Sequence, residues 1–438
     1  MNAVRRSLLL GLAILAVVSC RPGGESPAPT AISKETPSAG LKTPATAAEN
    51  TPAPATATSV ARPTATAAGV TPASATATSS PSPTATAAPR PPQQPPPPTL
   101  NIEVLLKGLQ TPWAIDFAPD GRIFLTERPG RIRVVRNGQL QAEPWMTLDV
   151  VEAGETGLLG LALDPQFATN SFVYAAYTYR SGGRLLNRLA RLREDPASGK
   201  GLLDKVLIDS VAGGNNHDGG RVKFGPDGKL YWTMGETFNR PLAQDLSSLN
   251  GKVLRLEPDG AIPKDNPLPN SFIYSYGHRN PQGLAWQPGT GRLYETEHGP
   301  SGEKGCCQDE VNLIEPGKNY GWPMISGDET REGMLSPVLQ SGDRVTWAPG
   351  GATFVTRGPW ADSLLFTGLR GQALYRLTLD PNDPRKVQSF DTLFERQFGR
   401  LRDVVEGPDG AIYLLTSNRD GRGSPGPDDD RVLRLTFR

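Results

Sequence analysis

The chain contains three histidines, His217, His278 and His298, and each stands in a glycine-rich polar stretch. An isolated histidine in a loop is more often a solvated residue than a catalytic one. Imidazole is nevertheless the usual general base near neutral pH, and no other part of the sequence supplies it. These three residues are therefore the first candidates for proton transfer, provided that the fold brings their loops together.

Cationic side chains form a second group of candidates near the C-terminal end. Arg400 and Arg402 are two residues apart, so on an extended chain they project to the same side, and Arg370 stands in a similar glycine-flanked turn. Paired guanidinium groups are suited to bidentate capture of carboxylates. The functional interpretation is a ligand bearing several carboxylates. A surface ladder of ion pairs with Asp403 and Glu395 is the alternative.

Acidic residues crowd the segment from 294 to 311. Carboxylates and the carbonyls of glycine and proline are hard oxygen ligands, which favour calcium over zinc, and the sequence has no spacing typical of a zinc site. A solvated acidic loop is the alternative. The acidic residues are Glu295, Glu297, Glu303, Asp309 and Glu310.

Two further patterns do not select a chemistry. Residues 421–426 match the letters of a dinucleotide-binding fingerprint, but no helix is expected after them and the acidic run 428–430 would repel a pyrophosphate. Cys306 and Cys307 are adjacent, and in an oxidising compartment they could close a disulfide ring or remain thiols.

Six similar segments after residue 100 must position these groups. Each begins with an apolar strand, often followed by a Pro-Asp-Gly turn, and the first strands centre at intervals of 46 to 68 residues. The centres are Phe117, Leu163, Phe224, Trp286, Phe354 and Val405. Closely spaced strands with turn signals and little helical periodicity predict an all-β fold, and regular repetition predicts radial blades.

The expected fold is thus a six-bladed β-propeller of four-stranded antiparallel blades, with a pair of packed sheets as the alternative. The last segment stops after its third strand, residues 431–437, and residues 101–106 form an apolar strand before the first segment. The N-terminal strand is therefore expected to complete the last blade. Equivalent loops of a propeller converge on one face around the central channel, so the candidate loops could meet there.

The N-terminal part has a different composition. Arg5 and Arg6 precede a short apolar run that ends at Cys20, and this predicts a lipoprotein signal peptide at 1–19 with Cys20 as the lipid-modified residue. An ordinary signal peptide with a chance cysteine is the alternative. Of the 79 residues from 21 to 99, 52 are Pro, Ala or Thr, and none is aromatic. Residues 20–99 are therefore expected to be a disordered tether, and 100–438 the propeller domain.

These features predict an exported protein anchored by its lipid to the outer face of a bacterial membrane. The net charge of the chain is +1, with both signs interspersed. The sequence thus has no excess or cluster of positive charge of the kind that binds nucleic acid, so we expect no nucleic-acid partner.

Seven motifs in order resemble the glucose/sorbosone dehydrogenase family, and in particular its soluble aldose sugar dehydrogenase branch. The resemblance covers nearly all of the chain from residue 100 to the end. The motifs occupy residues 154–160, 216–221, 277–283, 297–300, 309–312, 319–323 and 400–403.

The resemblance implies a six-bladed propeller that binds pyrroloquinoline quinone and Ca²⁺ and oxidises the anomeric hydroxyl of aldoses to lactones, with an external electron acceptor. It implies that His217 is the general base and that Arg279 and Asn280 polarise the quinone oxygen. The implied cofactor-binding residues are Glu155, Asn216, Gln282, His298, Arg370, Arg400 and Arg402. The implied calcium ligands are the carbonyls of Gly299 and Pro300 at the catalytic site, with Glu310 and the Tyr320 carbonyl at a structural site.

Two positions depart from the pattern of some members, since Glu155 stands in place of Gln and Arg370 in place of Lys. The insertion that carries Cys306 and Cys307 is also longer than in some relatives. Two other functions stay open from the sequence, a calcium-dependent lactonase on a similar propeller and a non-catalytic propeller that binds sugars or a protein.

Overall fold

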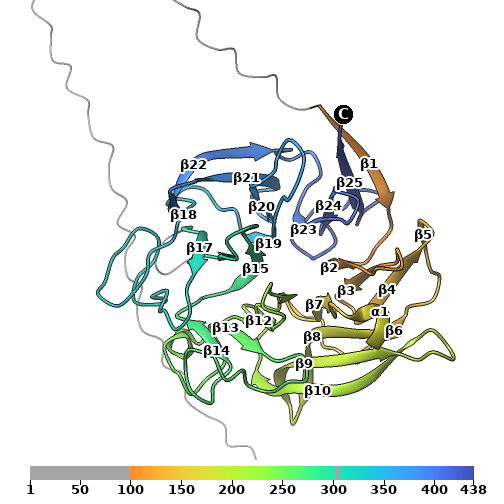
Figure 1. Cartoon of the computed structure of the whole chain (residues 1–438), viewed down its shortest axis with the longest axis horizontal. Coiled ribbons are helices and arrows are strands. Elements are labelled where there is room, and N and C mark those ends of the chain that lie inside the picture. Colours follow the sequence, from red (N-terminus) through yellow and green to blue (C-terminus); the bar gives the residue numbers. More distant parts are fainter. Residues whose placement is uncertain (1–98, 301–305) are drawn as a thin grey trace, which may run out of the picture. The chain divides into compact units, whose positions relative to one another are not determined.

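The computed structural model describes residues 99–300 and 306–438, and these form a ring of six antiparallel sheets (Figure 1). The predicted signal peptide, Cys20, the tether up to residue 98, and Glu303 lie outside the described residues. Within the described part of the chain, no helix is both long and apolar enough to cross a bilayer. The predicted six-bladed propeller is confirmed, and the alternative of two packed sheets is excluded.

The first three blades follow one another along the chain. The first consists of β2 (Pro112–Phe117), β3 (Ile123–Glu127), β4 (Arg131–Arg136) and β5 (Gln139–Leu140), with β6 (Met146–Thr147) also paired to β4. The second consists of β7 (Leu158–Leu163), β8 (Phe172–Ser181), β9 (Arg184–Glu194) and β10 (Gly201–Ala212), with the short helix α1 (Phe167–Asn170). The third consists of β11 (Val222–Phe224), β12 (Leu230–Met234), β13 (Lys252–Leu256) and β14 (Ile273–Tyr276), with the 3₁₀ helix η1 (Arg240–Ala243).

The next two blades and the last complete the ring. The fourth consists of β15 (Pro281–Trp286), β16 (Leu293–Glu297), β17 (Glu310–Ile314) and β18 (Leu339–Gln340). The fifth consists of β19 (Pro349–Phe354), β20 (Leu364–Gly368), β21 (Ala373–Asp380) and β22 (Asp383–Leu393). The sixth consists of β23 (Leu401–Glu406), β24 (Ile412–Thr416), β25 (Val432–Phe437) and β1 (Leu100–Leu106).

The two ends of the propeller are joined in the sixth blade. Strand β1 pairs antiparallel with β25, with Leu100 opposite Phe437 and Val104 opposite Leu433. The predicted closure by the N-terminal strand is therefore confirmed. This pairing gives the sixth blade its fourth strand and joins the two ends of the fold, because β1 and β25 satisfy each other's backbone groups along one side.

Aromatic and aliphatic side chains fill the spaces between neighbouring blades. Trp113 on β2, Leu158 on β7 and Val173 on β8 belong to one buried cluster that joins the first two blades. The predicted Pro-Asp-Gly hairpins also form, since Gly121 adopts a φ of 85° between β2 and β3. That left-handed conformation is the reason a glycine stands there.

The first strands of five blades carry an irregularity in their pairing with the second strand. In β15 the pairing skips Gln282, and in β23 it skips Arg402. A bulge leaves one residue outside the ladder and redirects its side chain. Both bulged residues belong to the set that the sequence singled out for ligand binding.

Candidate active site

A cavity of about 300 Å³ collects most of the predicted site residues. Its wall includes eleven of them: Glu155, Asn216, His217, Arg279, Gln282, His298, Gly299, Pro300, Arg370, Arg400 and Arg402. The three that do not line it are Asn280, Glu310 and Tyr320.

The lining residues come from several blades, but most of them share two positions: just before the first strand of a blade, or just after its second strand. Glu155 precedes β7 and His217 precedes β11, while Arg279 precedes β15. Others follow the second strand of a blade, such as His298 after β16 and Arg370 after β20. These positions all lie at one end of the blades, so the loops converge as the propeller geometry predicts.

His217 is held in one orientation by Glu236, a residue at the end of the following hairpin. The Nδ1 of His217 lies 2.5 Å from Glu236 Oε1, and both side chains are buried. A carboxylate only accepts hydrogen bonds, so Nδ1 carries the proton and Nε2 is left as the acceptor. His217 also has a φ of 61°, an uncommon conformation for a residue with a side chain.

Phe238 covers His217 at the edge of the cavity. The two ring centroids are 4.0 Å apart with an interplanar angle of 34°. Phe238 is nevertheless 61% exposed, and it too has a positive φ. An exposed aromatic ring held against a buried imidazole gives the cavity an apolar surface next to its candidate base.

The other two histidines occupy different environments. His298 lines the cavity and donates from Nε2 to the Pro349 carbonyl at 2.9 Å. Burial lowers the pKa of His298 to about 3, so this imidazole is neutral and presents Nδ1 as an acceptor. His278 is buried away from the cavity, so the three histidines do not share one site.

Arg279 and Asn280 stand side by side in the sequence but not in the cavity wall. Arg279 lines it, donates from Nη1 to the His298 carbonyl at 3.0 Å, and lies 5.4 Å from the centre of the Trp322 ring. Asn280 is fully buried behind the wall. Its Oδ1 accepts from the Gly219 amide at 3.1 Å and its Nδ2 lies 3.4 Å from Glu155 Oε2, so it supports the wall from behind.

Arg402 is the most unusual charge in the site. Its side chain is buried and donates to Gln282 Oε1 at 2.5 Å, but its Nε is buried without a hydrogen-bond partner. Burial, with Arg400 and Arg128 nearby, lowers the pKa of Arg402 to about 9. A buried guanidinium with an unsatisfied donor is costly unless a ligand supplies the missing acceptor, which is best an anion.

Arg400 is also buried and is fixed by Asp420, whose Oδ2 accepts from Nε at 2.8 Å. The alternative of a surface ladder is wrong for Arg400 and Arg402. Asp403 is fully buried and instead pairs with Arg221 at 3.0 Å. The third arginine of the group, Arg370, projects from the loop after β20 into the cavity wall.

The carbonyl-rich turn at Gly299 is shaped for close approach of backbone oxygens. A Cβ at Gly299 would lie 2.1 Å from the carbonyl oxygens of both Cys307 and Gln308. Asp309 fixes this turn, because its carboxylate accepts from the Gly299 amide at 2.9 Å and from the Trp347 amide at 2.7 Å. Backbone carbonyls and carboxylates are the hard oxygen donors that Ca²⁺ prefers, and both kinds occur in this turn.

Glu310 lies in a second acidic cluster, separate from the cavity. Glu295 and Glu310 both accept from the Asn312 amide group, at 3.1 and 3.2 Å, and Glu295 Oε1 is buried without a partner. Burial and the neighbouring Glu297 raise the pKa of Glu310 to about 8 and that of Glu295 well above its usual range. These buried carboxyls need a proton or a cation.

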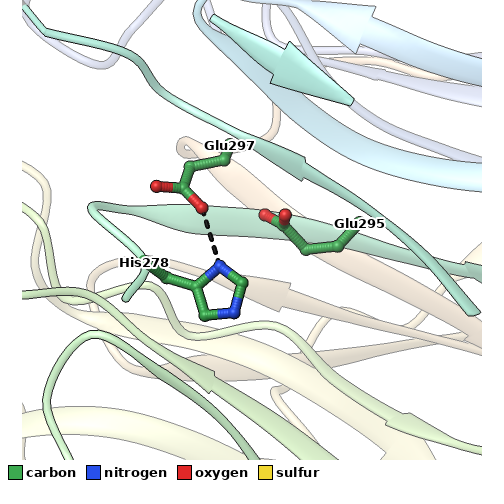
Figure 2. A group of neighbouring side chains, drawn as sticks. All are labelled: His278, Glu295 and Glu297. Atoms are coloured by element: carbon green, nitrogen blue, oxygen red, sulfur yellow. Dashed lines mark hydrogen bonds and ion pairs between the residues drawn. The ribbon is translucent and has the colours of Figure 1, made fainter. Parts of the chain in front are cut away.

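Figure 2 shows how this cluster continues around His278. Glu297 points toward the His278 ring, with its Oε2 at 2.9 Å from Nδ1, and Glu295 lies beside them (Figure 2). Ligand-capable atoms of these three residues all lie within 4.8 Å of one another. The ring of Tyr320 stacks on His278 at 4.8 Å, which places Tyr320 next to the cluster as well.

Several residues of the site were not among the predicted site residues. Glu236, Phe238 and Arg422 line or support the cavity, yet none belongs to a pattern typical of catalysis. Cys306 also lines the cavity, and its sulfur is placed in a disulfide with that of the adjacent Cys307.

Comparison with known proteins decides the family. A sequence profile for glucose/sorbosone dehydrogenases matches residues 109–425. The chain belongs to the glucose/sorbosone dehydrogenase family. The chain is 32% identical to the aldose sugar dehydrogenase YliI of Escherichia coli over 357 residues, which cover 74% of this chain and 92% of that protein.

Solved structures of family members agree. A putative oxidoreductase (glucose dehydrogenase) of Thermus thermophilus is 48% identical, with a TM-score of 0.72 over 77% of this chain and all of that one. The PQQ-bound aldose sugar dehydrogenase of Streptomyces coelicolor is 36% identical, with a TM-score of 0.68 over 78% of this chain and all of that one. This glucose/sorbosone dehydrogenase chain thus shares the fold of these two proteins.

Proposed function

We propose that this family member is a quinoprotein dehydrogenase that oxidises the anomeric hydroxyl of aldose sugars to lactones, using pyrroloquinoline quinone and Ca²⁺. The observation that carries the proposal is the pairing of His217 with Glu236 at a cavity walled by arginines. One oriented proton acceptor and several anion-binding groups are what such a reaction requires of the protein.

The residues fit the cofactor on their own chemistry. The unpartnered Nε of Arg402 calls for an anionic acceptor, and Arg370 and Arg400 add two further guanidinium groups to the same wall. These three residues would hold carboxylates of the quinone, with Gln282 supporting Arg402. The carbonyls of Gly299 and Pro300 would hold the catalytic Ca²⁺. The remaining contacts with the cofactor would come from Glu155, Asn216 and His298.

When bound, the quinone supplies the two-electron acceptor for the hydride that leaves the anomeric carbon. His217 takes the hydroxyl proton on Nε2, and Glu236 stabilises the imidazolium that forms, because its carboxylate already accepts from Nδ1. Arg279 places positive charge beside the reacting centre, where developing negative charge is stabilised without reorganisation. Asn280 acts from behind the wall by holding Glu155 and the Gly219 amide.

Phe238 gives this site a surface for the sugar. Its ring lies over His217 and is largely exposed, so the apolar face of a pyranose can pack there while its hydroxyl groups face polar residues. The second acidic cluster, with Glu310 and the neighbouring Tyr320 carbonyl, would hold a structural Ca²⁺ that compensates the buried carboxyls.

Reconstitution tests the proposal. The purified full chain would be loaded with quinone and Ca²⁺, and aldoses would be offered with a reducible dye as the external electron acceptor. Dye reduction that requires quinone supports the proposal. Hydrolysis of lactones without quinone would indicate the lactonase instead, and sugar binding without either reaction would indicate a binding propeller.

The sequence also supports the proposal that the protein is exported and anchored by a lipid on Cys20 at the outer face of a bacterial membrane. Labelling with a radioactive fatty acid tests this directly. The wild type is expected to incorporate label and to fractionate with membranes. A Cys20→Ala variant is expected to lose both properties, and labelling of that variant would contradict the assignment.

A further inference from the structure

Arg422 crosses from the sixth blade to the opposite side of the cavity mouth. It lies in the loop between β24 and β25, and its side chain is about half exposed. Its Nη1 donates to Glu155 Oε1 at 2.6 Å and its Nη2 donates to Asn216 Oδ1 at 2.7 Å. One guanidinium thus joins the sixth blade to the loops that precede β7 and β11.

Glu155 is an anion at the centre of this contact. Burial alone would raise its pKa, but nearby His298, the hydrogen bond and charge of Arg422, and His217 lower it to about 2. Among the described groups that hydrogen bond to the Glu155 carboxylate, Arg422 is the one that carries a positive charge. The second carboxylate oxygen of Glu155 accepts from the His217 amide at 3.2 Å.

The loop that carries Arg422 is fixed to the cofactor wall. Asp420 accepts from the Arg422 amide through Oδ1 at 2.9 Å and from Arg400 through Oδ2. A Cβ at Gly423 would lie 2.5 Å from the Asn418 carbonyl oxygen and 2.9 Å from Arg400 Cδ, so only glycine allows this approach. Gly423, one of the glycines that match the dinucleotide fingerprint, therefore allows this loop to pack against Arg400.

We propose that Arg422 is a latch for the cofactor cavity, which neutralises Glu155 and holds the loop of the sixth blade against Glu155 and Asn216, so that an anionic quinone could bind beside them. The inference rests on the proposed function. It concerns Arg422, which contacts Glu155 and Asn216 in the wall of the cofactor cavity. It explains how this chain keeps a carboxylate at a position where some relatives have a neutral glutamine. The positive charge of Arg422 compensates the negative charge of Glu155, which would otherwise repel an anionic ligand.

A pair of substitutions separates this role from a merely structural one. Arg422→Ala leaves Glu155 charged and unpaired beside the cofactor's carboxylates, so we expect the quinone to bind at least about tenfold more weakly. In Glu155→Gln with Arg422→Ala, the repulsion is gone and the amide group of the glutamine faces the vacated space. The double variant is therefore expected to recover binding to within about threefold of the wild type.

The experiment measures quinone dissociation constants of the full chain in the presence of Ca²⁺. Quenching of tryptophan fluorescence provides the signal, because Trp113 and Trp322 lie against Arg402 and Arg279 in the cavity wall. Thermal unfolding of each cofactor-free variant verifies folding. Arg434→Ala is the matched control, since it removes a partly exposed arginine of β25 that pairs with Asp409 and does not line the cavity.

The expected pattern is weak binding in Arg422→Ala, near-normal binding in the double variant, and no change in Arg434→Ala. If the wild type binds quinone and Arg422→Ala has the same quinone dissociation constant, the latch is overturned and the proposed function stays intact. A double variant as weak as Arg422→Ala would also overturn it. Absence of quinone binding in the wild type would instead refute the proposed function, and the latch with it.

Discussion

Arg402→Met is expected to affect stability and ligand binding in opposite directions. The guanidinium is buried with an unpartnered Nε, and burial lowers its pKa from its usual value to about 9. Because one pKa unit corresponds to about 1.4 kcal/mol, keeping this charge in the folded protein costs on the order of 5 kcal/mol. The cost applies in full below about pH 9 and decreases as the pH rises toward the usual pKa of arginine, because the unfolded chain then binds more protons.

Methionine removes the charge but keeps much of the volume that packs on Trp113. The lost hydrogen bond leaves Gln282 Oε1 without its donor, which costs about 1–3 kcal/mol, so a net gain of a few kcal/mol remains. The Tm of the cofactor-free protein at pH 7 is therefore expected to rise by several degrees. Removing a buried charged partner of the quinone costs about 2–5 kcal/mol of binding, so affinity should fall by about thirtyfold or more.

Scanning calorimetry of the cofactor-free protein and titration with quinone measure the two effects on the same samples. Arg376→Met is a suitable control, since Arg376 pairs with Asp391 in the fifth blade and does not line the cavity. A loss of stability in Arg402→Met with unchanged quinone affinity would refute the reasoning, because Arg402 would then be a structural residue.

Three other changes test the remaining roles. His217→Gln is expected to abolish sugar oxidation while quinone binding is retained, and equal turnover in dye reduction would remove the general-base assignment. Glu236→Gln should lower kcat by roughly 10- to 100-fold, because it loses a hydrogen bond to a charged group worth about 1.5–3 kcal/mol. The quinone dissociation constant of this variant should change little. Chelation of Ca²⁺ should lower the Tm of the wild type, and this difference should shrink in Glu310→Gln, which removes a carboxylate from the acidic cluster. A wild-type Tm that does not change on chelation would contradict a structural cation in the acidic cluster.

The fold was predictable from the chain because its signals are local and repeated. Each of the six predicted centres, from Phe117 to Val405, lies in the first strand of its blade, and residues 101–106 join the last blade as expected. A strand, a turn and the next strand are encoded within about ten residues, so periodicity alone predicts them. The residue types of the site were visible for a similar reason, since histidines are few and arginines form a short motif.

The partners of those residues could not be predicted. Arg402 reaches the cavity from a bulge, whereas the sequence suggested a regular extended chain with Arg400 and Arg402 on the same side. Asp403 pairs with Arg221, which lies 182 residues away in the sequence. Nothing near His217 in the sequence indicates that Glu236 fixes its tautomer. The separation of His278 from the other two histidines likewise depends on which loops face the channel and which face the interior.

The amino-acid sequence by itself determined the number of blades, the strand that closes the ring and the chemical types that gather at one end of it. Only the tertiary structure decided which charges meet, as in the contact of Arg422 with Glu155 across 267 residues. The physical reason is that strands follow from hydrogen bonds and apolar alternation among near neighbours. Charge compensation instead depends on burial and distance between loops that only the closed ring brings together.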